Sequence, residues 1–138
     1  MSEQLAIEAH ADMVSLGPLL DRIDGFGVNQ GWPKNILSQV RLVFEEIIVN
    51  VISHGTVGQI VPKLEVVLTQ VESQLEIQIA DNAIAFDPLK AEAPNLDASL
   101  EDRAVGGLGV FLICQMMGSV SYRRDGEWNR LLIKKIIE

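Results

Sequence analysis

Three stretches of the chain alternate hydrophobic and polar residues with the period of a strand. Residues 63–72 and 74–81 are separated only by Ser73, and together they predict two adjacent antiparallel strands. Residues 4–9 alternate less regularly and predict a short first strand. Residues 119–137 predict a final hairpin with Asp125-Gly126 as its turn.

Two other stretches show the longer apolar period of a helix. Asp12 is a suitable N-cap for a helix over residues 13–26, although Pro18 within that stretch requires a bend or a later start. A long helix is predicted from Pro33 to Ser53, ending at His54-Gly55. In this helix we expect Glu45 to face solvent, paired with Arg41 four residues before it.

Residues 82–105 lose all periodicity, and such long connections are usually functional or disordered. Gly106–Gly109 then opens an apolar helix that is predicted to end near Gly118. The order of elements predicts an α+β fold, a two-layer sandwich with a mixed, mainly antiparallel sheet and helices on one face. With 138 residues, of which 48% are hydrophobic, we expect a single domain over residues 1–138.

Charge and composition narrow the classes of partner. A formal net charge of −8 disfavours nucleic acid, and no apolar run reaches the roughly 20 residues that a membrane span requires. The acidic N-terminus lacks the basic and apolar regions of a signal peptide, and a single cysteine is typical of a reducing compartment. We therefore expect a cytoplasmic protein.

The long helix carries a polar seam on an otherwise apolar surface. Glu46 and Asn50 are four residues apart and therefore lie on the same helical face. One interpretation is a solvated or mutually satisfied pair. The other is chemical, because a carboxylate can act as a general base and the Asn oxygen is a ligand that suits Mg²⁺.

Two later positions are also open to two interpretations. Asp81 ends a strand and is either a turn residue or a buried acceptor for the exocyclic amine of adenine. The glycines of Gly106–Gly109 either form a tight turn or allow backbone N–H groups to approach phosphate oxygens. Arg103, just upstream, is a candidate cation for a polyphosphate.

Taken together, three segments resemble the sequence boxes of a known superfamily. EEIIVNVISHG is similar to the N box, IADNAIAFDP to the first glycine box, and RAVGGLGVFLI to the second glycine box of the GHKL (Bergerat-fold) ATPases. The small size and the wording of the boxes resemble most closely the anti-sigma factor serine/threonine kinases of the RsbW type. The resemblance covers nearly the whole chain.

The resemblance implies an ATP site with Mg²⁺. Glu46 matches the catalytic base, Asn50 the Mg²⁺ ligand and Asp81 the acid that binds the adenine amino group, while residues from about 88 to 105 match the ATP lid. The other residues that it assigns to nucleotide binding are Ala83, Phe86, Arg103, Gly107, Leu108 and Gly109.

The resemblance also implies a function, a serine/threonine protein kinase that phosphorylates a STAS-type anti-sigma antagonist. A sigma factor would compete with that antagonist, and the family is expected to form homodimers. One position departs from the pattern, because Ala83 stands where the first glycine box has Gly. Its methyl group either weakens nucleotide binding or is accommodated by a small shift. The alternative function is therefore a non-catalytic module that senses nucleotide or sequesters a partner.

Overall fold

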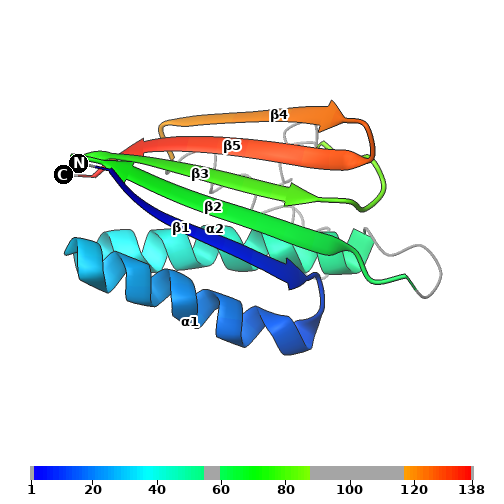
Figure 1. The fold of residues 1–138 in the computed structure, drawn as a ribbon, viewed down its shortest axis with the longest axis horizontal. Helices are drawn as coiled ribbons and strands as arrows, with labels where there is room; N and C mark the ends of the chain where they lie inside the picture. The colour runs from blue at the N-terminus through cyan, green and yellow to red at the C-terminus, as the bar shows by residue number, and fades with distance from the viewer. Residues whose placement is uncertain (1, 55–59, 88–116, 138) are drawn as a thin grey trace, which may run out of the picture.

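The computed structural model describes residues 2–54, 60–87 and 117–137. In chain order the elements are β1 (Ser2–His10), α1 (Met13–Gln30), α2 (Lys34–His54), β2 (Lys63–Val71), β3 (Gln74–Asp81), β4 (Ser119–Asp125) and β5 (Trp128–Ile136). They form two layers, with α1 and α2 together on one face of the sheet (Figure 1). The predicted α+β sandwich is confirmed.

The sheet has five strands in the order β1-β2-β3-β5-β4. Every pairing between these described strands is antiparallel. Along β2 each second residue is buried against the helices, from Leu64 to Gln70, and the residues between them are half-buried or exposed. The alternation therefore fixes which side chains face the helical layer and which lie on the open face.

Helix α1 begins as predicted, since Asp12 accepts a hydrogen bond of 2.7 Å from the Ser15 N–H. It continues through Pro18 and extends past the predicted end at residue 26. Gly31, with φ of 76°, ends it in the left-handed conformation that glycine adopts readily. Gly27, within the helix, has no space for a side chain, because a Cβ there would overlap the ring of Trp32.

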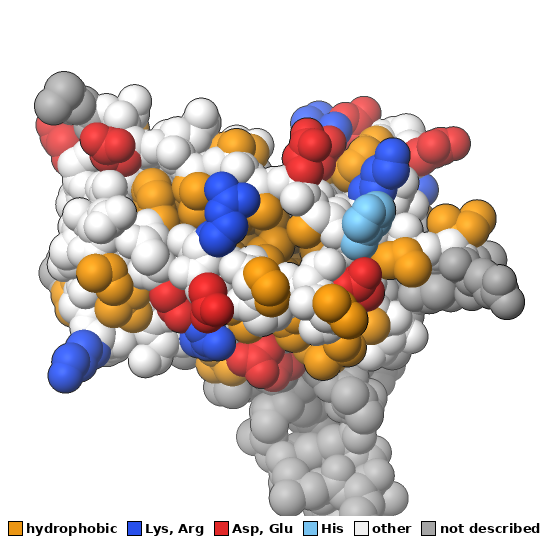
Figure 2. Space-filling model, turned by 60° about the horizontal axis from the view of Figure 1, so that its bottom comes forward, with side chains coloured by type: hydrophobic (Ala, Val, Ile, Leu, Met, Phe, Trp, Pro, Cys, Tyr) orange, Lys and Arg blue, Asp and Glu red, His pale blue; other side chains and the backbone are white. Residues whose placement is uncertain are grey.

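Helix α2 supplies much of the core, and it ends at His54 as predicted. Val40, Val43 and Phe44 are fully buried against the sheet, where Val66 and Ile77 are equally inaccessible. Seen from the helical side, hydrophobic, acidic and basic side chains are interspersed over the molecular surface (Figure 2). None of the helices in the described part of the chain has the length and apolar character needed to span a bilayer.

Two local predictions are wrong. Glu45 is exposed as expected, but Arg41 binds Asp24 of α1 instead, because the antiparallel helices bring that carboxylate closer. In the final hairpin Asp125 still pairs with Trp128, so the turn falls one residue later than predicted. Gly126 takes the first central position with φ of 59°, a conformation that glycine adopts without steric cost.

The predicted helix that follows Gly106 lies outside the described residues, except for its last positions. Met117 and Gly118 form a bend there rather than the end of a helix.

Candidate nucleotide-binding site

The polar seam of α2 lies on the helix half that ends beneath the C-terminal end of β3 (Figure 1). Asn50 is only 9% exposed, and its neighbours on the helix include the buried Ile47. Its side chain makes no hydrogen bond to any residue in the described part of the chain. A side chain that is largely buried and has no partner among the described residues can offer its amide oxygen to a ligand.

Glu46, one turn before Asn50, is half-buried and has no ion pair with the residues that the structure describes. Burial raises the pKa of the Glu46 carboxyl above its ordinary value of 4.5, and the neighbouring Glu45 carboxylate raises it further. A carboxyl whose pKa moves toward neutrality is better suited to accept a proton from a hydroxyl.

Asp81 is the last residue of β3 and is 7% exposed. Its Oδ1 accepts two hydrogen bonds, from the Ala83 N–H at 3.0 Å and from Asn129 Nδ2 at 2.8 Å. No donor within the described residues reaches Oδ2. Burial raises the pKa of Asp81 above 3.8, although the bonds from Asn129 and Ala83 and the charge of Arg124 oppose that rise.

Asn129 on β5 connects three segments and was not predicted. Its Nδ2 donates to Asp81 Oδ1 and to the Ile84 carbonyl at 2.9 Å. Its Oδ1 accepts from the Tyr122 hydroxyl at 2.6 Å and from the Phe86 N–H at 3.3 Å. Asn129 is 6% exposed, and its hydrogen bonds hold both Asp81 and the chain that follows it in place.

Arg124 on β4 holds the same chain segment from its other side. Its guanidinium donates to the Ala83 carbonyl at 2.9 Å and to Asn129 Oδ1 at 3.1 Å, and its Nε donates to the Gly126 carbonyl. A sequence signal existed for Asn129, because it shares the helix-facing side of β5 with the buried Leu131 and Ile133. For Arg124, at the end of a polar strand, the sequence carried no such signal.

Ala83 and Phe86 lie in the loop that these bonds fix. Ala83 is 7% exposed, and its φ is outside the left-handed region, so the backbone there does not require glycine. Phe86 is 42% exposed at the edge of the loop. The other predicted site residues lie outside the described residues, as does the predicted lid over residues 88–105: Arg103, Gly107, Leu108 and Gly109.

The described donors fit a magnesium ion that is held mainly by its nucleotide. Three or more His, Cys, Asp or Glu side chains do not gather anywhere in the described ranges, so the protein offers no cage of its own there. Mg²⁺ usually takes one or two protein oxygens, with phosphate and water completing the shell. The side-chain oxygen of Asn50, which has no partner among the described residues, is a ligand of this kind.

The chain is similar to proteins that are named as kinases. The chain is 29% identical to the serine/threonine-protein kinase BtrW of Bordetella bronchiseptica, over 80% of this chain and 78% of that protein. It is 28% identical to the serine-protein kinase RsbW of Listeria monocytogenes, over 97% and 87% of the two chains. For RsbW of Bacillus thuringiensis the identity is 26%, over 96% and 84%.

A model of the histidine kinase-like ATPase domain matches residues 9–135. The match includes α2 with its polar seam, Asp81 and Asn129. Because it covers most of the chain, this protein belongs to the histidine kinase-like ATPase domain family, as its resemblance to the GHKL ATPases predicts.

Proposed function

We propose that the protein is an ATP- and Mg²⁺-dependent serine/threonine protein kinase of the anti-sigma type. The observation that carries the proposal is the polar seam of α2, where Glu46 and Asn50 have no partner within the described structure. Such a seam presents a carboxylate and an amide oxygen on one helical face, where a ligand or substrate can bind them. The relatives named as serine or serine/threonine kinases support the same reaction class.

In this proposal Glu46 is the general base. Its carboxylate accepts the proton of a Ser or Thr hydroxyl while the hydroxyl oxygen forms a bond to the γ-phosphorus of ATP. The bond between that phosphorus and the β,γ-bridging oxygen breaks, and ADP leaves. The raised pKa of Glu46 favours this role, because proton transfer is most efficient when the pKa lies nearer the working pH.

Asn50 would hold the Mg²⁺ ion through its side-chain oxygen. Bound Mg²⁺ neutralises charge on the phosphates during phosphoryl transfer. The position of Asn50 one turn after Glu46 keeps the base and the metal ligand on one side of the helix.

Asp81 would select adenine. Its Oδ1 is already engaged by Ala83 and Asn129, which leaves Oδ2 to accept from the exocyclic amine. Guanine presents a carbonyl oxygen at the equivalent position, so two acceptors would face each other without a proton between them. This arrangement predicts a preference for ATP over GTP.

The proposed substrate is a Ser or Thr of a STAS-type antagonist protein, in the cytoplasm, with a sigma factor as the competing partner. The family resemblance and the names of the relatives support a protein substrate. The alternative, a non-catalytic module that senses nucleotide or sequesters a partner, was motivated by Ala83. The ordinary φ of Ala83 means that its backbone is unstrained, and the names of the relatives favour the kinase.

The test is phosphoryl transfer from γ-labelled ATP to the protein that co-purifies with the chain. Glu46→Gln keeps the shape of the side chain and should abolish transfer while a fluorescent ATP analogue still binds. Glu45→Gln is the matched control, because Glu45 is the adjacent residue but is exposed. Transfer that persists in Glu46→Gln would contradict the role of the base, and no saturable nucleotide binding at millimolar concentration would refute the kinase.

A further inference from the structure

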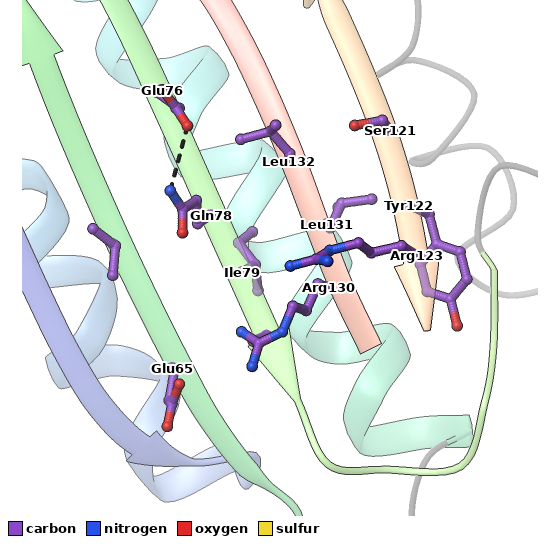
Figure 3. Close-up of a pocket in the computed structure, with 12 residues that line it drawn as sticks. Glu65, Glu76, Gln78, Ile79, Ser121, Tyr122, Arg123, Arg130, Leu131 and Leu132 are labelled. Atoms are coloured by element: carbon purple, nitrogen blue, oxygen red, sulfur yellow. Dashed lines mark hydrogen bonds between the residues drawn. The ribbon is translucent and has the colours of Figure 1, made fainter. Parts of the chain in front are cut away.

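The carboxylate that is proposed to meet the adenine base belongs to a row of side chains that crosses three strands. Asp81 of β3 is the register partner of Asn129 of β5, and Asn129 is the register partner of Arg124 of β4. Tyr122, two residues before Arg124, lies on the same side of β4. In Figure 3 its ring extends away from the guanidinium group of Arg123, which lies over the open face. The final hairpin therefore supplies the hydrogen-bonding side chains beside Asp81.

Hydrogen bonds leave the amide of Asn129 only one orientation. Its Oδ1 meets three donors: the Tyr122 hydroxyl at 2.6 Å, Arg124 Nη1 at 3.1 Å and the Phe86 N–H at 3.3 Å. Its Nδ2 meets acceptors, among them Asp81 Oδ1 at 2.8 Å. A half-turn of the amide would place its NH2 group against a guanidinium and a backbone N–H, which cannot accept, and its oxygen against the carboxylate. The side chains of β4 and the loop thus make Asn129 donate toward Asp81.

Asp81 is held by donors at only one of its two oxygens. Oδ1 accepts from Asn129 Nδ2 and from the Ala83 N–H at 3.0 Å, and no donor within the described residues reaches Oδ2. Both groups at Oδ1 donate, and neither can accept. The side chain at position 81 must therefore turn an acceptor toward Asn129, and the atom at the place of Oδ2 is left to contact a base.

Purines differ at the atom that would meet Oδ2. Adenine carries an exocyclic amine at this position of the ring, which donates, whereas guanine carries a carbonyl oxygen, which accepts. Hypoxanthine carries the same carbonyl oxygen and lacks the second amino group of guanine. The carboxylate oxygen of Asp81 accepts and so matches adenine. An amide at position 81, with its oxygen held by Asn129 and Ala83, would direct its NH2 group to the base and match the 6-oxo purines.

We infer that Asn129 is a specificity-determining residue for the purine, because the direction in which it donates decides which atom of the side chain at position 81 faces the base. Asn129 acts through Asp81 and is therefore a positioning residue, which Tyr122 and Arg124 hold in turn. The inference rests on the proposed contact between Asp81 and adenine. It goes beyond that contact, since it assigns the choice between 6-amino and 6-oxo purines to a side chain that does not touch the nucleotide.

Isothermal titration calorimetry of the full chain with Mg²⁺ and either ATP or inosine triphosphate (ITP) measures the preference. The wild type should bind ATP at least about tenfold more tightly than ITP, because ITP would set two acceptors against each other. Asp81→Asn should reverse the preference to at least about tenfold in favour of ITP, because the new amide keeps its oxygen toward Asn129 and Ala83.

The decisive variant combines Asp81→Asn with Asn129→Asp. The new carboxylate at position 129 accepts from Tyr122 and Arg124, and it also requires a donor from position 81. The amide at position 81 should therefore turn its NH2 group toward it and its oxygen toward the base. This turn loses the bond from the Ala83 N–H, but a charge-assisted bond is about twice as strong as a neutral one. The preference should return to ATP by at least about threefold.

The matched control combines Asp81→Asn with Asn82→Asp, which restores the same charge one residue away. Asn82 is exposed, and its Oδ1 accepts from the Lys63 N–H instead of lying against Asp81. This variant should keep the preference for ITP. Circular dichroism checks that each variant is folded.

A second pair of variants tests Tyr122 without a change at position 129. Tyr122→Phe, added to Asp81→Asn, removes the 2.6 Å donor to Asn129 and should lower the preference for ITP by at least about threefold. Ser121→Ala, added to the same variant, removes a hydroxyl group from an exposed position of β4 and should leave the preference unchanged.

The outcomes separate this inference from the proposed function. A wild type that binds neither nucleotide would refute both. A wild type that binds ATP, together with a folded Asp81→Asn variant that still prefers ATP or binds neither nucleotide, would overturn the inference and leave the kinase proposal intact. Equal binding of ATP and ITP by the wild type would also overturn it. So would an unchanged preference for ITP when either Asn129→Asp or Tyr122→Phe is added to Asp81→Asn in a folded protein.

Discussion

Replacing Asn129 with Ala should be among the most damaging changes outside the nucleotide contacts. The change removes one charge-assisted hydrogen bond, to Asp81 at 2.8 Å, and neutral bonds to the Tyr122 hydroxyl and the Ile84 carbonyl. The bond to Asp81 is worth about 1.5–3 kcal/mol and each of the neutral bonds about 1 kcal/mol. The free energy of unfolding should therefore fall by about 3–5 kcal/mol.

The bonds from Phe86 and Arg124 add little to that figure. The Phe86 N–H lies 3.3 Å from the acceptor, and Arg124 is an exposed side chain that water can solvate after the change. The matched control is Asn82→Ala. Asn82 is an exposed residue of the same loop, and its Oδ1 accepts one bond, from the Lys63 N–H. Its loss should cost about 1 kcal/mol.

Urea denaturation measures the stability, and titration with a fluorescent ATP analogue measures the affinity. If Asn129 orients Asp81, affinity should fall about tenfold or more at a temperature where the variant is folded. Equal effects of Asn129→Ala and Asn82→Ala on both quantities would refute the reasoning. A loss of stability with unchanged affinity would limit Asn129 to a structural role.

Two further results are expected. Asn50→Ala should weaken Mg²⁺-dependent ATP binding about tenfold and leave Mg²⁺-independent binding unchanged. The control is Asn35→Ala, at an exposed position of the same helix, which should change neither kind of binding. An equal loss in both variants would contradict the metal-ligand role of Asn50. Because the pKa of Asp81 is raised in the folded protein, this group binds its proton more tightly when folded, and its contribution to stability is lost as the pH rises from 3.8 through the raised value. Urea denaturation across that range should therefore show that Asp81→Asn gains stability relative to the wild type as the pH rises, and that the gain then levels off. A difference in the free energy of unfolding that does not change with pH would contradict the raised pKa of Asp81.

The pattern of hydrophobic and polar residues predicted the strands well, because burial of one strand face is visible in neighbouring residues. The alternation in residues 63–81 located β2 to within one residue and β3 at its observed bounds, because one face of each strand is buried and the other is not. The end of α1 was placed four residues too early, since glycines at 25 and 27 weaken a helix. A glycine is nevertheless needed at position 27 because the ring of Trp32 leaves no room for a side chain, a tertiary contact that propensity does not contain.

The candidate site shows the same division. Glu46 and Asn50 could be grouped from the sequence because a helix brings residues four apart together. Asn129 could not be joined to Asp81, because the pairing of β3 with β5 spans 48 residues and depends on the sheet order. Sequence boxes therefore predicted the groups proposed to touch the nucleotide, and only the fold revealed the side chain that holds one of them in place.

The two tryptophans of the chain are placed so that their fluorescence reports on different parts of the molecule. Trp32 is 5% exposed, lies against Gly27 and donates a 2.6 Å bond to Gln70, so its emission reflects the intact core. Trp128 lies on the open face with the Arg130 guanidinium 5.9 Å from its ring, one residue before Asn129. A Trp32→Phe protein would thus carry Trp128 as its single tryptophan, positioned to report on changes in the loop beside Asp81.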